Sequence, residues 1–104
     1  MSTSNETWGR RLKEARVNAG LSQKQLGIQA GLDQFVASTR INRYELGVHK
    51  ADYLIVQNLA QILDVPTGYF YTEEDDLAEL MLTYHRCSAR KKSEIGKVIR
   101  KLMG

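Results

Sequence analysis

The segments LSQKQLGIQAGL at residues 21–32 and RINRYELG at residues 40–47 decide the fold of this chain. In the first segment, Ser22 and Gln25 have the spacing of a capping box, in which the two residues cap each other's backbone N–H groups at the start of a helix. Gly31 is a stop signal, because glycine readily adopts the left-handed conformation that ends many helices. We therefore predict a helix that opens after Ser22 and ends at Ala30.

The small residues in this region predict that a second helix crosses the first. Two helices joined by a tight turn need a very small residue where the backbones approach, and a glycine at the turn. Gly27 and Gly31 occupy these two places. The apolar residues expected to face the crossing are Leu26, Ala30 and Leu32. We expect the second helix to be capped by Asp33 and to run to Leu46.

Helix signals also lie on both sides of this pair. A first helix is expected over residues 5–19, with Ser4 as its cap and Gly20 as its stop. Its apolar stripe is Trp8, Leu12, Ala15 and Ala19. Another helix is expected over residues 52–63. Its buried side chains are expected to be Leu54 or Ile55, Leu59, Ile62 and Leu63. Residues 67–71 should form one short helical turn.

Two further amphipathic helices are expected after residue 71. Thr72 is the expected cap of the first, and four acidic residues at 73–76 suit the positive end of a helix dipole. The apolar stripe of this helix is Leu77, Leu80, Met81 and Tyr84, and that of the last helix is Ile95, Val98, Ile99 and Leu102. Because strand signals are scarce, we predict an all-α fold of seven short helices.

The composition fits one globular domain, or one domain with an appendage. The 104 residues are 42% hydrophobic and 26% charged, which argues against a disordered chain. No apolar run approaches the roughly 20 residues that span a bilayer, and the first residues lack the pattern of a secretory signal. The single cysteine, Cys87, cannot form an internal disulfide. We therefore expect a soluble, cytoplasmic protein.

Charge is strongly segregated along the chain. Residues 1–50 carry eight basic and four acidic side chains, residues 51–85 carry seven acidic side chains only, and residues 86–104 carry seven basic and one acidic. The basic N-terminal half is suited to a polyanion, whereas the acidic middle is not. Alternatively, the acidic and basic stretches neutralise each other within the fold.

The sequence LSQxxLGxxAGL, followed by RINRYExG, resembles the phage-repressor and Cro-like (XRE-type) helix-turn-helix family. The resemblance covers about residues 8–70 and includes Arg11-Leu12 and the run LAxxLDVPxxYFY that begins at Leu59. It implies a lambda-repressor-like domain of five helices over residues 1–71, in which the helix ending near Glu45 enters the major groove of DNA.

One feature departs from the family pattern. Gly31 to Glu45 spans fifteen residues, where most members have about eleven. With four extra residues, Ile41 and Tyr44 fill the core positions of the recognition helix. Four residues are close to one helical turn. We therefore expect either a lengthened turn or an additional turn of helix that contains Phe35 and Val36.

The predicted DNA-contacting residues follow from this alignment. The exposed face of the recognition helix should carry Ser38, Thr39, Arg40, Asn42 and Arg43. These residue types can read base edges, for example arginine on guanine and asparagine on adenine. The resemblance assigns Ser38, Thr39 and Arg43 to base-contacting positions, and Gln34 is the candidate if the extension lies elsewhere. The alternative for each is an ordinary solvated surface residue.

Phosphate contacts and one ion pair are expected around the recognition helix. Gln23 opens a helix, where free backbone N–H groups suit a phosphate, and the family uses this glutamine on the DNA backbone. Weaker phosphate candidates are Arg10, Lys24, His49 and Lys50, together with Asn42. In some relatives, the positions of Arg16 and Glu45 form a partly buried ion pair between the first and third helices.

Residues 72–104 are expected to form a dimerisation element. The predicted contacts are Tyr69, Phe70, Leu77, Leu80, Met81, Tyr84, Ile95, Val98, Ile99 and Leu102. A two-fold dimer would present two recognition helices to a palindrome, about 34 Å apart. The simpler alternative is that these stripes pack against each other within one chain.

The sequence therefore predicts a dimeric, sequence-specific DNA-binding regulator, most simply a repressor, with no cofactor. No catalytic triad order, glycine-rich phosphate loop or HExxH motif occurs, so enzyme activity has no support. His85 and Cys87 are only half of a metal site. The competing interpretation is an adaptor or antitoxin-like protein that uses the same fold to bind a protein partner, such as a toxin or antirepressor.

Overall fold

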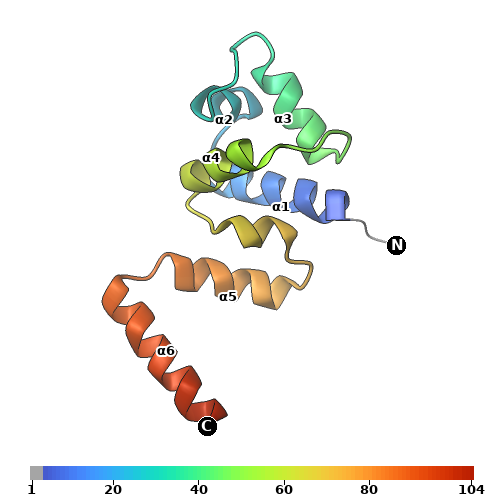
Figure 1. Ribbon diagram of the computed structural model, residues 1–104. Coiled ribbons are helices and arrows are strands. Elements are labelled where there is room, and N and C mark those ends of the chain that lie inside the picture. The colour runs from blue at the N-terminus through green and yellow to red at the C-terminus, as the bar shows by residue number, and fades with distance from the viewer. Residues whose placement is uncertain (1–3) are drawn as a thin grey trace.

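The computed structural model describes the backbone of residues 4–104 and the side chains from residue 6 onward. Among these residues the structure is entirely helical, as the sequence predicts (Figure 1). The elements are α1 (Ser4–Asn18), α2 (Gln23–Gln29), α3 (Ala37–Glu45), α4 (Tyr53–Leu63), the 3-10 helix η1 (Thr67–Tyr71), α5 (Asp75–His85) and α6 (Ala89–Met103).

The elements from α1 to η1 form a globular body whose core is built on α1. The ring centroid of Trp8 lies 5.6 Å from that of Tyr44 in α3 and 5.7 Å from that of Phe70 in η1. Its indole Nε1 donates a hydrogen bond to the Tyr71 hydroxyl at 3.0 Å. This tryptophan therefore joins the first, third and fifth helical elements.

The boundaries of α1 differ from the prediction at both ends. Ser4, the expected cap, already belongs to the helix, and the helix ends at Asn18. Ala19 is consequently exposed and does not extend the buried stripe of Trp8, Leu12 and Ala15.

The α2–α3 crossing follows the predicted pattern. The capping box of Ser22 and Gln25 is present in full. A Cβ atom at Gly27 would lie 2.7 Å from the Cβ of Ala37, so the two helices approach more closely than a side chain allows. Gly31 has φ +95°, a conformation that is strained for residues with a side chain. The two glycines thus fix the distance and the turn between the helices.

The connection between α2 and α3 is a lengthened turn, the first of the two alternatives. Asp33 does not cap α3, because α3 begins only at Ala37. Instead, the Asp33 carboxylate accepts a hydrogen bond from the backbone N–H of Phe35 at 2.8 Å. The backbone N–H of Val36 donates to the Asp33 carbonyl at 3.1 Å. The extra residues therefore form an ordered turn that precedes α3 in the chain.

Helix α4 and η1 close the body around the central pair. Asp52 caps α4 through a hydrogen bond from the Ile55 N–H, and the left-handed Asp64 ends it. Of the two alternatives for the inward position, Leu54 is exposed and Ile55 packs on the core. Val56 is buried although it was not predicted to be.

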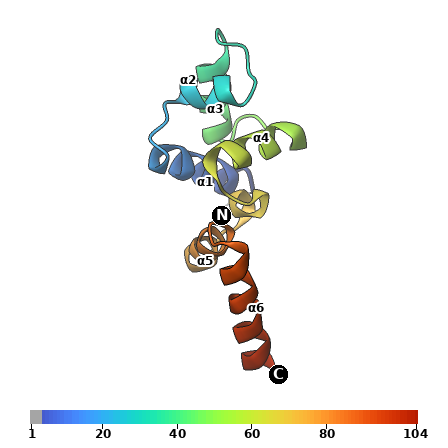
Figure 2. The ribbon, with the colours of Figure 1, turned by 90° about the vertical axis from the view of Figure 1, so that its left-hand side faces the viewer.

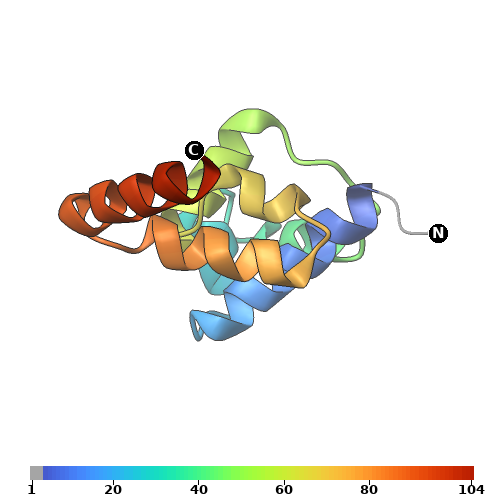
Figure 3. The same ribbon diagram turned by 90° about the horizontal axis from the view of Figure 1, so that it is seen from below.

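The last two helices extend away from the body. Thr72 does not cap α5, since its hydroxyl donates to the Gly68 carbonyl and the helix begins at Asp75. Figures 1 and 3 show α5 running back beneath the body, and α6 then turns away at an angle. No residue of α6 is buried. In Figure 2, α6 and the α2–α3 turn lie at opposite ends of the molecule.

None of the helices described here is long and apolar enough to cross a membrane.

Candidate nucleic-acid interface

Helix α3 has one buried face and one polar, solvent-exposed face. Ala37, Ile41 and Tyr44 are buried, at a spacing of three and four residues. The exposed polar side chains of α3 are those of Ser38, Thr39, Arg40, Asn42 and Arg43. The face that was predicted to read bases is therefore open to solvent along the length of the helix.

An ion pair between α1 and α3 holds the C-terminal end of α3. The guanidinium of Arg16 binds the Glu45 carboxylate through two nitrogens, with Nη2 to Oε1 at 3.1 Å. Arg16 Nη1 also donates to the Leu21 carbonyl at 3.0 Å, and the Glu45 side chain is almost fully buried. A bidentate pair of this kind fixes direction as well as distance. The orientation of α3 on the body is set by it.

The Gln23 side chain links this ion pair to the exposed face of α3. Its Nε2 donates to Glu45 Oε1 at 3.0 Å and to Asn42 Oδ1 at 3.1 Å. Since both bonds use the amide nitrogen, the side chain of Gln23 is oriented by residues of α3. Sequence reasoning treated Gln23 and Asn42 as separate DNA contacts, whereas the structure joins them directly.

Arg40 is partly engaged within its own helix. Its Nη2 donates to the Tyr44 hydroxyl at 3.0 Å, and its guanidinium lies over the Tyr44 ring. Arg40 nevertheless remains exposed as part of the polar face of α3.

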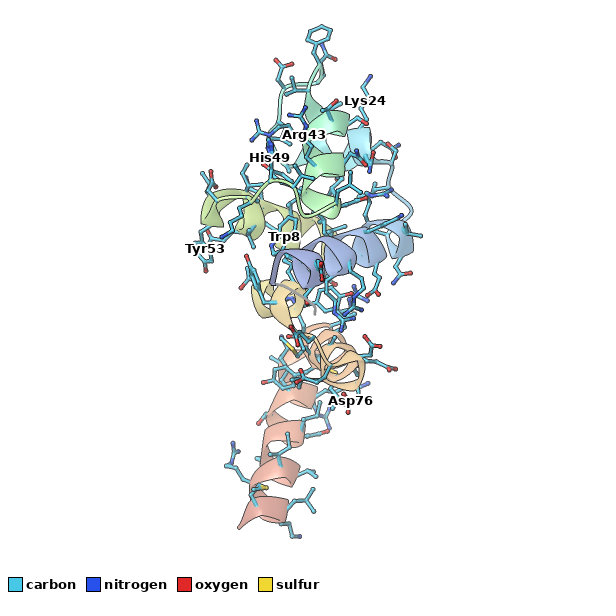
Figure 4. The ribbon with its side chains drawn as sticks, turned by 90° about the vertical axis from the view of Figure 1, so that its right-hand side faces the viewer. Trp8, Lys24, Arg43, His49, Tyr53 and Asp76 are labelled. Atoms are coloured by element: carbon cyan, nitrogen blue, oxygen red, sulfur yellow. The ribbon has the colours of Figure 1, made fainter. Side chains whose placement is uncertain are left out.

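Basic or titratable side chains lie on α3 and on the segments next to it. Figure 4 shows Lys24, Arg43 and His49 on the half of the molecule that contains α2 and α3, well away from Asp76 on α5. Lys24 and His49 are exposed, as is Lys50. The loop that holds His49 is tied to α3, because the N–H groups of Val48 and His49 both donate to the Arg43 carbonyl.

Arg10 does not belong to this surface. Its Nη1 lies 3.4 Å from Glu14 and 3.3 Å from Asp75, and its Nη2 contacts the Glu73 carbonyl at 3.5 Å. Two carboxylates already neutralise this guanidinium, and they would repel a phosphate. The folding of α5 thus brings acidic residues to Arg10, an arrangement that disfavours the predicted phosphate contact.

Gln34 lies outside the helix that it was expected to begin. It is exposed in the turn before α3, next to Asp33 and Phe35.

The predicted dimer contacts divide into two groups. Tyr69 and Phe70 were expected to contact a second chain. Both are buried in the core of the chain itself, so their surfaces are not available for that contact. The α5 and α6 residues retain accessible surface, and the most exposed are Leu80 and Leu102. An apolar groove between the two helices is lined by Leu77, Leu80, Met81, Tyr84, Ile95 and Ile99.

Two residues that position the site were not predicted from the sequence. A Cβ atom at Gly9 of α1 would lie 2.9 Å from the Tyr44 carbonyl oxygen, so α3 crosses α1 at this glycine. Glycine inside a helix costs about 1 kcal/mol relative to alanine, which is a signal that a packing reason exists. The other residue is Arg11, which is buried.

Arg11 joins α1 to the segment that leads into α5. Its Nε donates to the Thr72 carbonyl at 2.8 Å, and its Nη2 contacts the Glu73 carbonyl at 3.0 Å and Asp75 Oδ1 at 2.9 Å. The hydrogen bond from Arg11, assisted by Arg10, holds the pKa of Asp75 below its ordinary value. Burial, together with the nearby Glu14 carboxylate, raises the pKa of Tyr69 above its ordinary value.

The described side chains contain no cluster of three or more His, Cys, Asp or Glu that could hold a metal ion. His85 lies 3.3 Å from the Asp64 carboxylate, where it bridges the end of α5 to the end of α4.

Comparison with known proteins gives consistent matches. Residues 9–76 match the helix-turn-helix domain family. The chain is 32% identical over 65 residues to uncharacterized HTH-type transcriptional regulators of Sinorhizobium medicae (strain WSM419) and Rhizobium meliloti (strain 1021). Each alignment covers 62% of this chain and 44% of the relative, so the chain spans less than half the length of these curated relatives.

A solved structure is similar over most of the chain. The crystal structure of the transcriptional regulator BswR superimposes with a TM-score of 0.85 at 44% sequence identity. The match covers 89% of this chain and 92% of the other, so it extends beyond the segment shared with the curated relatives.

Proposed function

This chain belongs to the XRE-type helix-turn-helix family of transcriptional regulators, and from that premise we propose that it is a repressor that binds a palindromic operator as a homodimer. The observation that carries the proposal is the exposed polar face of α3, held in one orientation by the Arg16–Glu45 ion pair and by Gln23. A rigid helix with a free polar face is what readout in the major groove requires.

We propose that base readout is shared among the side chains of this face. Arg43 can bind O6 and N7 of a guanine with two hydrogen bonds, and the methyl group of Thr39 can contact a thymine. The Oδ1 of Asn42 accepts a hydrogen bond from Gln23, so its amide nitrogen remains available to donate a hydrogen bond to an adenine. Ser38, Arg40 and Gln34 are the further candidates for contacts at base edges.

Phosphate contacts would then come from the elements around α3. Gln23 begins α2 and lies beside Asn42, so its remaining carboxamide surface and the first N–H groups of α2 are suited to a phosphate on the groove edge. Lys24 follows on the same helix, and His49 and Lys50 follow α3 in a loop tied to Arg43. These contacts would set the register of the protein on DNA without selecting bases.

Dimerisation through residues 72–104 is supported by the uncovered apolar surface of α5 and α6. Helix α6 buries none of its residues, although its apolar side chains repeat at helical spacing. Leu102 and Met103 are 79% and 83% exposed. Exposed apolar surface of this extent on a helix that projects from the body marks an interaction site. We propose that α6 of one chain packs into the α5–α6 groove of its partner.

Charge on these helices is compatible with that arrangement. The outer side of α5 is acidic and α6 carries Arg90, Lys91, Lys92, Lys97, Arg100 and Lys101. Within the described part of the chain, no ion pair joins α5 to α6, and the pair Arg90–Glu94 lies inside α6. Lys92 lies over the Tyr84 ring of α5, and the other basic side chains of α6 that form no ion pair could contact the acidic α5 of a second copy.

Selection of bound sequences from a random pool of double-stranded DNA tests the proposed function. We expect enrichment of an inverted repeat whose half-site centres are about one helical turn, or a multiple of it, apart. Binding to that operator should weaken steeply with salt, by about 0.9 log units per decade for each phosphate neutralised. Failure to enrich any sequence would contradict the proposal.

Within a bacterial cell, a protein with this function would act in the cytoplasm, where the operator DNA lies.

The exposed apolar face also supports a second candidate, an adaptor or antitoxin-like role in which a different protein covers α5 and α6. In that case the purified chain stays monomeric and the pool yields no inverted repeat. The same two measurements, oligomeric state and sequence selection, therefore separate the candidates.

A further inference from the structure

The turn between α2 and α3 exposes an aromatic residue beside the proposed DNA-reading face. Phe35 is 86% exposed, more than the other large apolar side chains described in the molecule. Figures 1 and 2 show this turn as the tip of the α2–α3 end, remote from α5 and α6. Single exposed apolar residues are ordinary on protein surfaces, so the exposure alone assigns no role to Phe35.

The backbone around Phe35 is fixed. Its N–H donates to the Asp33 carboxylate at 2.8 Å, and the N–H of Val36 donates to the Asp33 carbonyl at 3.1 Å. Ala37, two residues later, packs directly against Gly27. The phenyl ring is thus carried on an ordered turn whose position relative to α3 is set from both sides.

The position of this turn limits what Phe35 can contact when α3 lies in a major groove. Phe35 precedes Ser38, the first residue of the proposed base-reading face, by three residues. In helix-turn-helix complexes it is the N-terminal residues of the recognition helix that reach the base edges. A side chain just before that end is therefore within reach of the bases that the helix would read.

We infer that Phe35 is a specificity-determining residue that packs against the C5-methyl group of a thymine in each half-site. This inference rests on the proposed function. The thymine methyl is the apolar group that base pairs present in the major groove, whereas phosphates and the other base-edge groups are polar. Wedging between base pairs is a less suitable role, because residues that do so typically enter from the minor groove.

Replacing thymines in the selected operator by uracil, one position at a time, tests the inference, because uracil lacks only the methyl group. For the full chain, we expect a position in each half-site, other than any thymine that Thr39 contacts, where uracil weakens binding by about fourfold, the value of one buried methyl group. In Phe35→Ala, binding to the thymine operator should weaken, and uracil at that position should have no further effect.

Two variants serve as controls. Phe35→Leu keeps an apolar side chain and should retain part of the sensitivity to uracil. Lys24→Ala should lower the affinity for every operator and keep the sensitivity at that position unchanged. Since the Phe35 side chain is exposed, all variants should give the circular dichroism spectrum of the original chain.

The outcomes distinguish the inference from the proposed function. If uracil weakens the original chain and Phe35→Ala equally at every position, Phe35 does not contact a methyl group and the inference is overturned. The inference is also overturned if Phe35 acts by separating stacked bases. In that case a fluorescent base analogue in the operator would report unstacking with the original chain and less of it with Phe35→Ala. If the original chain selects no sequence from the pool, the proposed function itself fails.

Discussion

The Glu45 carboxylate receives hydrogen bonds from Arg16 of α1 and from Gln23 of α2. It is almost fully buried, so these donors replace the water that the charge would otherwise bind. One residue near the end of α3 therefore connects three helices. Through Gln23, the same carboxylate also orients Asn42 on the exposed face.

Removal of this carboxylate should destabilise the fold. We expect Glu45→Ala to lower the free energy of unfolding by about 3 kcal/mol, because the largely covered Arg16 guanidinium would lose its carboxylate partner. Urea denaturation measures the change. The control is Glu94→Ala, which breaks the exposed Arg90–Glu94 pair and should cost less than about 1 kcal/mol. Equal effects of the two substitutions would contradict the role given to Glu45.

Arg43 and Lys50 should differ in what their removal changes. Arg43→Ala should relax the base preference at one position of each half-site, with a loss of about 1–3 kcal/mol on the original operator. Lys50→Ala should weaken binding to all sequences alike and reduce the salt dependence by about one phosphate contact. Titrations of single-base operator variants at several salt concentrations measure both effects. A sequence-independent loss in Arg43→Ala would exclude base readout by this residue.

At the scale of elements, α5 is attached to the body at both of its ends. Arg11 and Arg10 bind Asp75 at its start, and the Arg86 guanidinium donates to the Asp64 carbonyl at 3.0 Å just after its end. Between these points Ala78 is buried. Helix α6 has no comparable attachment among the described residues, since it buries no side chain. The C-terminal segment is thus one anchored helix followed by one that projects from it.

The attachment at Asp75 should weaken in acid. Arg11, followed by Arg10, lowers the pKa of Asp75 below its ordinary value of 3.8. A lowered pKa in the folded state means that its stabilising contribution is present above pH 3.8 and is lost as the pH falls through the lowered value. Asp75→Asn should therefore reduce stability at neutral pH and flatten the dependence of stability on pH in this acidic range.

Urea denaturation of the original chain and of Asp75→Asn, between neutral pH and pH about 2, measures this difference. The matched control is Glu79→Gln, because this carboxylate of α5 lies beyond the first turn of the helix and is exposed, and its removal should leave that part of the profile unchanged. If both variants show the same acid dependence as the original chain, the attachment does not depend on the Asp75 charge.

The whole molecule is elongated, with principal extents of 52, 33 and 22 Å, because α6 extends away from the helices that form the core. The proposed DNA-reading end and the proposed dimerisation end are thereby separated (Figure 2). Separation allows a second copy to bind at α5 and α6 without covering α3. It also accounts for the charge pattern, since the acidic residues of α5 lie far from the DNA-reading end (Figure 4).

A charge on the exposed apolar face should prevent dimerisation. We expect the original chain to sediment as a dimer at micromolar concentration and Leu102→Asp to sediment as a monomer, because a buried unpaired carboxylate strongly destabilises an interface. The control is Val17→Asp on α1, an exposed apolar residue outside the proposed contact, which should remain dimeric. Operator affinity should fall in Leu102→Asp alone. A monomeric original chain would exclude the homodimer.

The sequence by itself determined the structural features that depend on residues close together in the chain. The capping box at Ser22, the turn at Gly31 and the buried positions Ile41 and Tyr44 lie where the local patterns predicted them. Such signals act within one or two helical turns, so their physical cause is already present in the chain. The exposed polar face of α3 followed from the same periodicity.

Tertiary structure decided which side chains meet across distant segments. Arg10 was expected at DNA but faces Asp75, which is 65 residues later in the chain. Tyr69 and Phe70 fill the core instead of an interface. A basic or apolar side chain has many possible partners in the sequence. The packing of α1 against α3 and η1, and of α5 against η1, determines which of those partners comes within reach.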